Sequence, residues 1–144
     1  MKRTFLIFTG LIFSMLLLIS CEEKLTAVAT NYFDDGTPQQ VLYYSIKGND
    51  SILMKRLDYH PNRTVSIEGS YKNGEREGEW KSWYENGNLW SVGNFKNGLS
   101  VGKTAVYHEN GNLYYSGTYG DQEKRIGTWK FYDIDGNLLE TIAY

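Results

Sequence analysis

Hydrophobic and polar positions alternate in short runs along most of the chain after residue 21. The runs are rich in Tyr, Trp, Val and Leu, and Asn-Gly, Asp-Gly or other polar pairs separate them. A period of two residues is typical of β-strands with one buried face, and Asn-Gly pairs are typical of hairpin turns. Since no segment after residue 21 keeps a helical period, the pattern predicts an all-β chain of short strands and tight turns.

Glycine positions reveal an internal repeat of about 24 residues. Gly69, Gly93 and Gly117 are each 24 residues apart, and the third copy carries one extra residue. Because a fixed period of this length indicates stacked structural units, we expect an elongated meander of β-hairpins. Residues 43–56 match the repeat poorly, so no role is assigned to them. We expect an irregular loop around residues 48–50. The three clear copies cover residues 69–92, 93–116 and 117–141, and weaker ones lie around Tyr32–Gly36 and Tyr59–Asn62.

Each copy is predicted to form one hairpin around an Asn-Gly or Asp-Gly pair, as at Asn86-Gly87. We expect a two-residue type I′ turn there, which needs positive φ at both residues. Trp80 could then lie over Gly93, which would give that glycine a packing role. The connections at the other end of the hairpins are expected to be longer and polar. Counting back from Asn86-Gly87 pairs Trp83 with Trp90, Lys81 with Val92, Trp80 with Gly93 and Gly78 with Phe95.

This register divides the aromatic side chains between the two faces of the sheet, because faces alternate along a strand. One face carries Trp80, Tyr84, Leu89 and Phe95. The other is predicted to carry an aromatic stripe, whose rings either cover a thin sheet or bind a protein, a glycan or a wall polymer. Large exposed apolar patches usually mark interaction sites. The candidate partner-binding residues of this stripe are Trp83, Trp90, Tyr107, Tyr114 and Tyr132.

The final segment, residues 138–144, is expected to pair with residues 127–132 on one side only. An unpaired strand edge is a template for another strand. We therefore expect this edge to pair with a partner or with a second copy of the chain; the alternative is that the segment Tyr32–Ile46 or solvent covers it.

The first residues have the order of an export signal. Lys2 and Arg3 precede an apolar run over residues 5–19, and Leu18-Ile19-Ser20-Cys21 follows. This tetrapeptide resembles the bacterial lipobox, which implies cleavage before Cys21 and a lipid anchor, with a diacylglyceryl group on the thiol and palmitate among the acyl chains. The alternative, an uncleaved transmembrane helix, needs ~20 apolar residues, and this run is shorter. We expect a helical signal peptide over residues 1–20, a lipidated tether over residues 21–30 and a repeat domain over residues 31–144.

Charge and residue types exclude several kinds of chemistry. Without the signal segment, 13 basic residues remain against 17 acidic ones, and the net charge of about −4 argues against nucleic-acid binding. Cys21 is the single cysteine, so no intramolecular disulfide is expected, and two scattered histidines fit no zinc site. His108 takes the place of Tyr84 and is interpreted as a structural substitution. Asp133–Asn137 is interpreted as a plain turn, because Tyr144 stands where a calcium loop needs Glu. We expect no catalytic residue, metal or cofactor.

The repeats resemble the bacterial variant of the MORN repeat (membrane occupation and recognition nexus). The resemblance covers residues 57–144 well and residues 31–56 poorly, and Thr104 departs from it where Trp80 stands in the first copy. Arg63 departs at the place of Gly87, and Ile142 at the place of Gly117, where it indicates a closing strand. The residues that carry it are Tyr84–Leu89 with Gly93–Gly98, and the equivalents His108–Leu113 and Tyr71–Gly74.

The resemblance implies a meander of stacked hairpins that acts as a non-enzymatic protein-binding or scaffold module. With the lipobox, it places that module on the periplasmic or outer face of the bacterial cell envelope, bound to a protein partner. Many bacterial relatives are labelled antitoxin-like. The alternative function is therefore an immunity protein that neutralises a toxin by surface contact.

Overall fold

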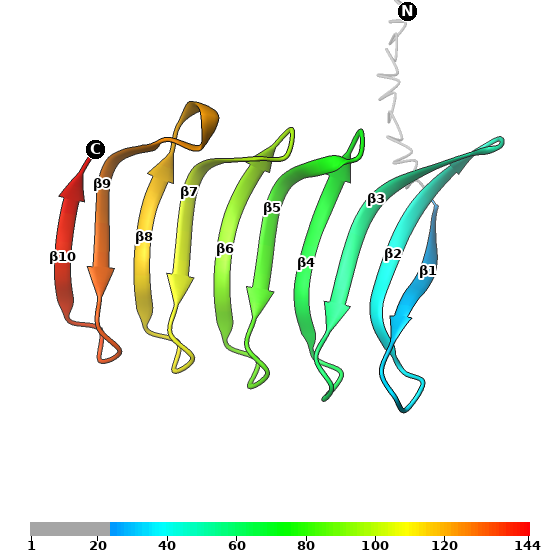
Figure 1. Ribbon diagram of the computed structural model, residues 1–144, viewed down its shortest axis with the longest axis horizontal. Helices are drawn as coiled ribbons and strands as arrows, with labels where there is room; N and C mark the ends of the chain where they lie inside the picture. The colour runs from blue at the N-terminus through cyan, green and yellow to red at the C-terminus, as the bar shows by residue number, and fades with distance from the viewer. Residues whose placement is uncertain (1–23) are drawn as a thin grey trace, which may run out of the picture.

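The computed structural model describes residues 24–144, and the expected signal peptide and Cys21 lie outside them. The described chain forms one open antiparallel sheet whose ten strands follow chain order (Figure 1). This meander confirms the predicted all-β fold of stacked hairpins. The strands are β1 (Leu25–Tyr32), β2 (Pro38–Lys47), β3 (Asp50–Tyr59), β4 (Val65–Lys72), β5 (Glu75–Trp83), β6 (Leu89–Lys96), β7 (Leu99–Tyr107), β8 (Leu113–Tyr119), β9 (Arg125–Tyr132) and β10 (Leu138–Ala143).

One short 3₁₀ helix, η1 (Asp121–Glu123), connects β8 to β9 and contains the extra residue of the third copy. Among residues 24–144, no helix has the length and apolar character that a membrane span requires. β10 pairs with β9, as expected for residues 138–144, and Ile142 opposes Trp129 in this closing strand.

The N-terminal part of the sheet is more regular than its sequence suggests. β1 begins at Leu25, inside the segment that we expected to be a tether, and pairs with β2 from Leu25 opposite Ser45 onwards. The irregular loop expected around residues 48–50 is absent from the described chain. Lys47 opposes Asp50, so Gly48 and Asn49 alone form the turn between β2 and β3. The tight turn requires a positive φ at Gly48, 64°, which glycine adopts readily.

The two ends of the hairpins use different turns, and their assignment reverses the prediction. At the lower edge in Figure 1, the amide of Gly87 donates to the carbonyl of Tyr84 at 3.0 Å, and the amide of Tyr84 donates to the carbonyl of Asn88 at 2.9 Å. Only Gly87 has positive φ in this loop. The loop therefore has three residues, a turn followed by a left-handed glycine, and is not type I′.

The type I′ turns lie at the opposite edge of the sheet, where longer connections were expected. Lys72 opposes Glu75, and both residues between them have positive φ, 53° at Asn73 and 82° at Gly74. The connection between β6 and β7 repeats this geometry with values of 50° and 79°. Both residues of a type I′ turn need positive φ, and Asn-Gly supplies it here.

The extra loop residue shifts the pairing beside the lower turns by one position. Trp83 opposes Leu89 where Trp90 was expected, and the predicted register returns at Ser82 opposite Ser91 and holds as far as Gly78 opposite Phe95. Each hairpin absorbs the slip as a β-bulge, an unpaired residue that re-aims a side chain. The unpaired residues are Gln39, Ser66, Trp90, Tyr114 and Leu139.

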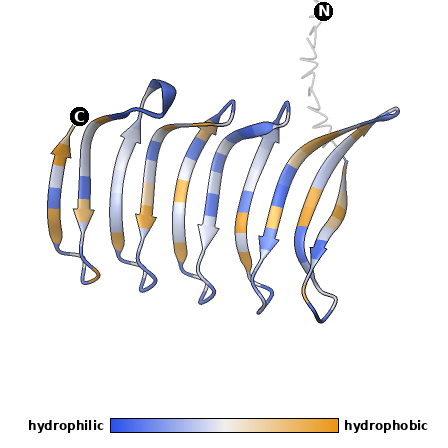
Figure 2. Ribbon diagram, viewed as in Figure 1, coloured by the Kyte–Doolittle hydropathy of each residue, from blue (hydrophilic) through white to orange (hydrophobic). Residues whose placement is uncertain are grey.

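A single sheet has no second layer to cover it, so its core consists of side chains that cover one another along one face. Hydrophobic segments lie within the strands, and the turns at both edges are mostly hydrophilic (Figure 2). Among the described residues, Trp80 and Trp129 are the hydrophobic side chains classed as buried, with 6% and 0% of their surface exposed. Side-chain packing on the sheet is therefore tightest around these two tryptophans.

Candidate functional site

One face of β4 to β10 carries a line of aromatic rings, which we call the aromatic row. Trp80 lies between Tyr71 and Phe95, with ring centroids 5.3 and 6.1 Å away and planes nearly perpendicular. Trp129 lies in the same way between Tyr119 and Tyr144, at 5.0 and 6.2 Å. Edge-to-face pairs at these distances are favourable beyond the area they bury. The aromatic row consists of Tyr71, Trp80, Phe95, Tyr119, Trp129 and Tyr144.

Each tryptophan of the aromatic row rests on a glycine of the preceding strand. A Cβ atom added to Gly69 would lie 2.0 Å from the Trp80 ring, and one added to Gly117 would lie 2.1 Å from the Trp129 ring. The expectation that Trp80 covers Gly93 is therefore wrong. The pairing between β4 and β5 is irregular beside Gly69, between Glu68 and Ser70, and the ring occupies the space that this glycine leaves.

An arginine covers each tryptophan from its other side. The guanidinium of Arg76 lies 4.4 Å from the centre of the Trp80 ring, and that of Arg125 lies 4.5 Å from the Trp129 ring. Arg125 also donates a hydrogen bond of 2.8 Å to the Tyr144 hydroxyl, which raises the pKa of the guanidinium. Cation–π contacts of this kind are stabilising, and more so where the ring is shielded from water. Glycine, tryptophan and arginine thus form a repeated three-layer stack.

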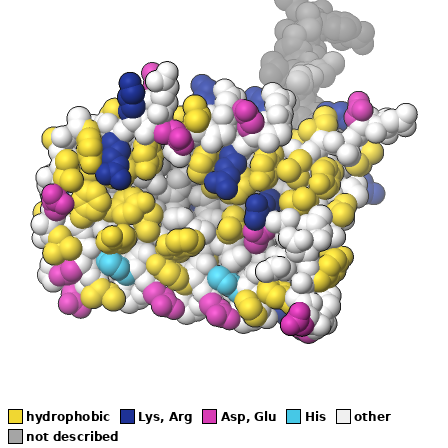
Figure 3. Space-filling model, viewed as in Figure 1, with side chains coloured by type: hydrophobic (Ala, Val, Ile, Leu, Met, Phe, Trp, Pro, Cys, Tyr) yellow, Lys and Arg dark blue, Asp and Glu magenta, His cyan; other side chains and the backbone are white. Residues whose placement is uncertain are grey.

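The middle unit of the sheet lacks this stack. Thr104 stands where Trp80 and Trp129 stand in the neighbouring units, and Ser100 stands at the place of Arg76 and Arg125. Gly93 keeps its position, and a Cβ atom added there would lie 3.3 Å from the Thr104 hydroxyl. A hollow of about 270 Å³, lined by Phe95, Thr104 and Tyr119 among others, occupies this place. Figure 3 shows the face, with hydrophobic side chains across it and a hollow near its centre.

The bulges change the predicted aromatic stripe. The Trp90 ring lies 6.0 Å from Tyr84 and lines the hollow, while the Tyr114 ring lies 5.4 Å from Tyr115, which stacks on Trp129. Both therefore lie on the face of the aromatic row, where 48% of Trp90 and 44% of Tyr114 is exposed. By alternation along the strands, the other three stripe residues lie on the opposite face. These are Trp83, Tyr107 and Tyr132, which oppose Leu89, Leu113 and Leu138.

The lower loops are joined to one another by side-chain hydrogen bonds to backbone. Tyr84 donates its hydroxyl to the carbonyl of Tyr107 at 2.8 Å, and His108 contacts the carbonyl of Tyr132 through Nε2 at 3.2 Å. A carbonyl only accepts, so Nε2 carries the proton. The interpretation of His108 as a structural substitute for Tyr84 is confirmed. Further donors to the next loop are His60, Asn62, Asn86, Asn88, Asn110 and Asn112.

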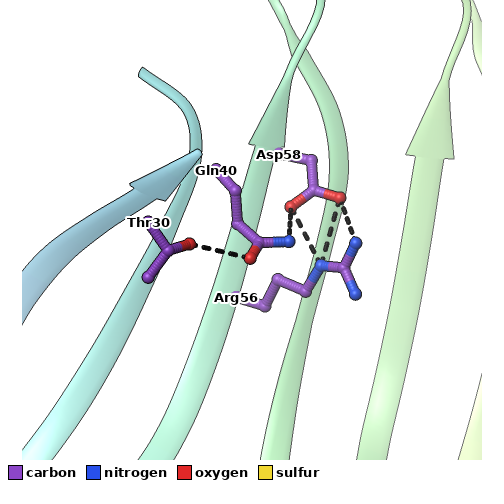
Figure 4. Close-up of polar contacts among 4 residues, drawn as sticks. All are labelled: Thr30, Gln40, Arg56 and Asp58. Atoms are coloured by element: carbon purple, nitrogen blue, oxygen red, sulfur yellow. Dashed lines mark hydrogen bonds and ion pairs between the residues drawn. The ribbon is translucent and has the colours of Figure 1, made fainter. Parts of the chain in front are cut away.

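Towards β1 the same face changes from aromatic to polar. Asp58 accepts hydrogen bonds from Gln40 at 3.0 Å and from the Arg56 Nε at 2.9 Å, and Gln40 accepts one from Thr30 at 2.8 Å (Figure 4). Asp58 is 14% exposed and raises the pKa of Arg56. Each of these polar groups is hydrogen-bonded to a neighbour, and the cluster lies at the end of the aromatic row nearest β1.

The described residues contain no group of three or more His, Cys, Asp or Glu placed to hold a metal ion. The Asp133 carboxylate accepts hydrogen bonds from the Asn137 side chain at 3.0 Å and from the amides of Asn137 and Asp135 at 2.8 and 3.0 Å. These bonds lower the pKa of Asp133, with the Asn137 side chain as the largest cause. The Asp133 carboxylate thus stabilises the turn in which it lies.

The MORN repeat variant family model matches residues 76–97 and 101–121. Two adjacent units of this chain are therefore similar to the MORN repeat variant. They correspond to the hairpins β5–β6 and β7–β8, and the hollow lies where these two repeats meet. No curated protein matches the sequence. MORN-repeat proteins are generally non-catalytic binding modules.

Sequence reasoning missed the arginine layer and the hollow, although the repeats contain a signal for both. Arg76 and Trp80 are four residues apart, as are Arg125 and Trp129. In the unit between them, both members of the pair change together, to Ser100 and Thr104.

Proposed function

We propose that this chain is a protein-binding module tethered to the bacterial cell envelope, with the face of the aromatic row as its contact surface. The observation that carries the proposal is the exposed aromatic area around the hollow, where about half of Trp90 and Tyr114 is open to solvent. Exposed aromatic patches on a folded domain mark interaction sites. The MORN-variant repeats support a binding role, because such modules act by contact.

The opposite face is less suited to an apolar partner. Its central part carries ion pairs, including Lys55 with Glu68 at 2.5 Å and Lys81 with Glu79 at 2.6 Å. Charged side chains are depleted at the centres of protein interfaces. The partner therefore binds the face of the aromatic row.

The proposed tether is the lipid on Cys21. A lipid anchor holds a protein at a membrane by its buried methylene groups, and two chains make the attachment stable. Mass spectrometry of the protein from bacterial membranes is expected to find an N-terminal, acylated Cys21, and Cys21→Ala is expected to release the protein. A chain that still begins at Met1, or an unmodified Cys21, contradicts this part of the proposal.

Site-directed photo-cross-linking tests the contact surface. A benzoylphenylalanine residue at Trp90 or Tyr114 is expected to give a defined adduct in intact cells, whereas one at the exposed Lys130 on the opposite face gives none. Equal adducts from both faces, or none from Trp90 and Tyr114, contradict the proposal. If the adduct contains a toxic protein whose activity the chain suppresses, the module is an immunity or antitoxin-type protein; otherwise it is a scaffold.

A further inference from the structure

The geometry points to the hollow at Thr104 as a receptor site for a single tryptophan side chain of a protein partner. This inference rests on the proposed function, and it names the group that the partner inserts. The chain itself supplies the template, since the equivalent places in the two neighbouring stacks are filled by Trp80 and Trp129.

The walls of the hollow match those around the two internal tryptophans. Trp80 has Tyr71 on one side and Phe95 on the other, both edge-on. Phe95 and Tyr119 are the corresponding residues on the two sides of Thr104, and both line the hollow. An indole placed there would complete the alternation of rings along the aromatic row, and Gly93 leaves its floor without a side chain.

Several polar groups that line the hollow are already paired, which favours an apolar occupant beside them. The Thr104 hydroxyl donates to the carbonyl of Val92 at 3.2 Å, and the amide of Ser100 donates to the Glu123 carboxylate at 2.9 Å. The hydroxyls of Ser82 and Ser91 bond to each other. A sugar or another polar ligand would find these hydroxyls and this amide already paired, and unpaired buried polar groups are costly.

The size and the surroundings favour a side chain over a free small molecule. At about 270 Å³ the hollow is slightly smaller than the ~300–1,000 Å³ of ordinary small-molecule pockets. The exposed Trp90 also lines it, and Tyr114 lies on the same face. A tryptophan anchored in a pocket and surrounded by weaker contacts is a common arrangement at the centre of protein interfaces.

The test uses the full chain in detergent micelles and a capped probe, N-acetyl-5-fluorotryptophanamide, observed by ¹⁹F NMR. We expect saturable broadening and a shift of the fluorine signal, with millimolar affinity. Thr104→Trp fills the hollow and is expected to weaken binding by at least about tenfold, corresponding to ~1.4 kcal/mol. The matched control, Thr118→Trp, places the same residue on the opposite face and leaves binding unchanged. Equal binding by both variants overturns the inference.

Two further arms make the result decisive. If Thr104→Trp does not fold by circular dichroism, Thr104→Leu adds less bulk at the same place and is expected to weaken the probe several-fold; unchanged binding overturns the inference. Free tryptophan is the competing source of an indole. If it binds and the capped probe does not, the site takes a metabolite and the partner side chain is refuted.

The outcome is separable from that of the proposed function. A partner that cross-links to Trp90 with equal yield in wild type and Thr104→Trp supports the binding face and overturns the tryptophan site. Loss of that adduct in Thr104→Trp, with Thr118→Trp unaffected, supports both. Thr104-dependent binding of the probe without any adduct supports the hollow as an indole site and counts against the proposed function.

Discussion

Replacement of Gly117 by alanine tests the packing of the aromatic row most directly. The new Cβ atom would lie 2.1, 2.3 and 2.6 Å from three atoms of the Trp129 ring, whereas ordinary contacts begin at 3.4 Å. The ring must therefore move by more than an ångström, or the strands must separate. Trp129 has 0% exposure and rings on several sides, so it has little room to move.

The expected cost follows from two limits. Overpacking of a core typically costs about 1–3 kcal/mol, and complete loss of a buried tryptophan's contacts costs about 3–5 kcal/mol. Backbone strain adds nothing, because φ at Gly117 is not positive, and alanine in a strand is favoured over glycine by ~0.5–1 kcal/mol. We therefore expect Gly117→Ala to lower the free energy of unfolding by about 2–4 kcal/mol.

Gly93→Ala is the matched control, since the repeat is the same and only the neighbour differs. Its Cβ atom would lie 3.3 Å from the small Thr104 side chain, so we expect a change within about 0.5 kcal/mol of zero. Urea titrations followed by circular dichroism measure both variants against wild type. Midpoints that coincide for Gly117→Ala and Gly93→Ala would refute the packing of tryptophan on glycine.

Three further predictions concern turns and pH. Arg63 holds the place of a loop glycine with φ of 71°, so Arg63→Gly is expected to raise the free energy of unfolding by about 1 kcal/mol in urea titrations. Gly111 has φ of 90°, so Gly111→Val is expected to cost about 1–3 kcal/mol, and Lys96→Ala almost nothing; equal midpoints contradict this. Burial raises the pKa of Tyr115, so its contribution is complete below about pH 10 and is lost as pH rises through the folded value. In thermal melts at rising alkaline pH, the unfolding midpoint of wild type should therefore fall more than that of Tyr115→Phe.

The repeat and its central register follow from the sequence because they depend on spacing within one unit. Glycines at a fixed period and alternating aromatic residues are sufficient to predict hairpins, and Gly78 to Ser82 pair as counted. The turn type does not follow, since Asn-Gly occurs at both ends of the hairpins. In the lower loop Asn86 accepts a hydrogen bond from the amide of Asn88 at 2.9 Å and donates to Glu109 of the next unit at 3.0 Å. A contact with the next unit cannot be read from one hairpin.

The candidate site was harder to predict because a slip of one residue moves a side chain to the other face. The unpaired position in each hairpin places Trp90 and Tyr114 with the aromatic row and leaves Trp83 on the other side. The hollow, in contrast, was accessible to a comparison of the copies with one another. Thr104 departs from the repeat together with Ser100, and this joint change is the sequence signal of the missing stack.

The side-chain hydrogen bonds between the lower loops all run in one direction, so successive units are joined in the same way. Tyr84 and Asn86 donate to the unit that follows, and His108 and Asn110 donate to the one after that. A whole unit can be duplicated or removed while every donor still finds a carbonyl. Contacts in repeat proteins extend only to nearest neighbours, so a change in one unit alters the surface locally. Substitutions within a single unit can thus create a new recognition site while the other units keep their structure.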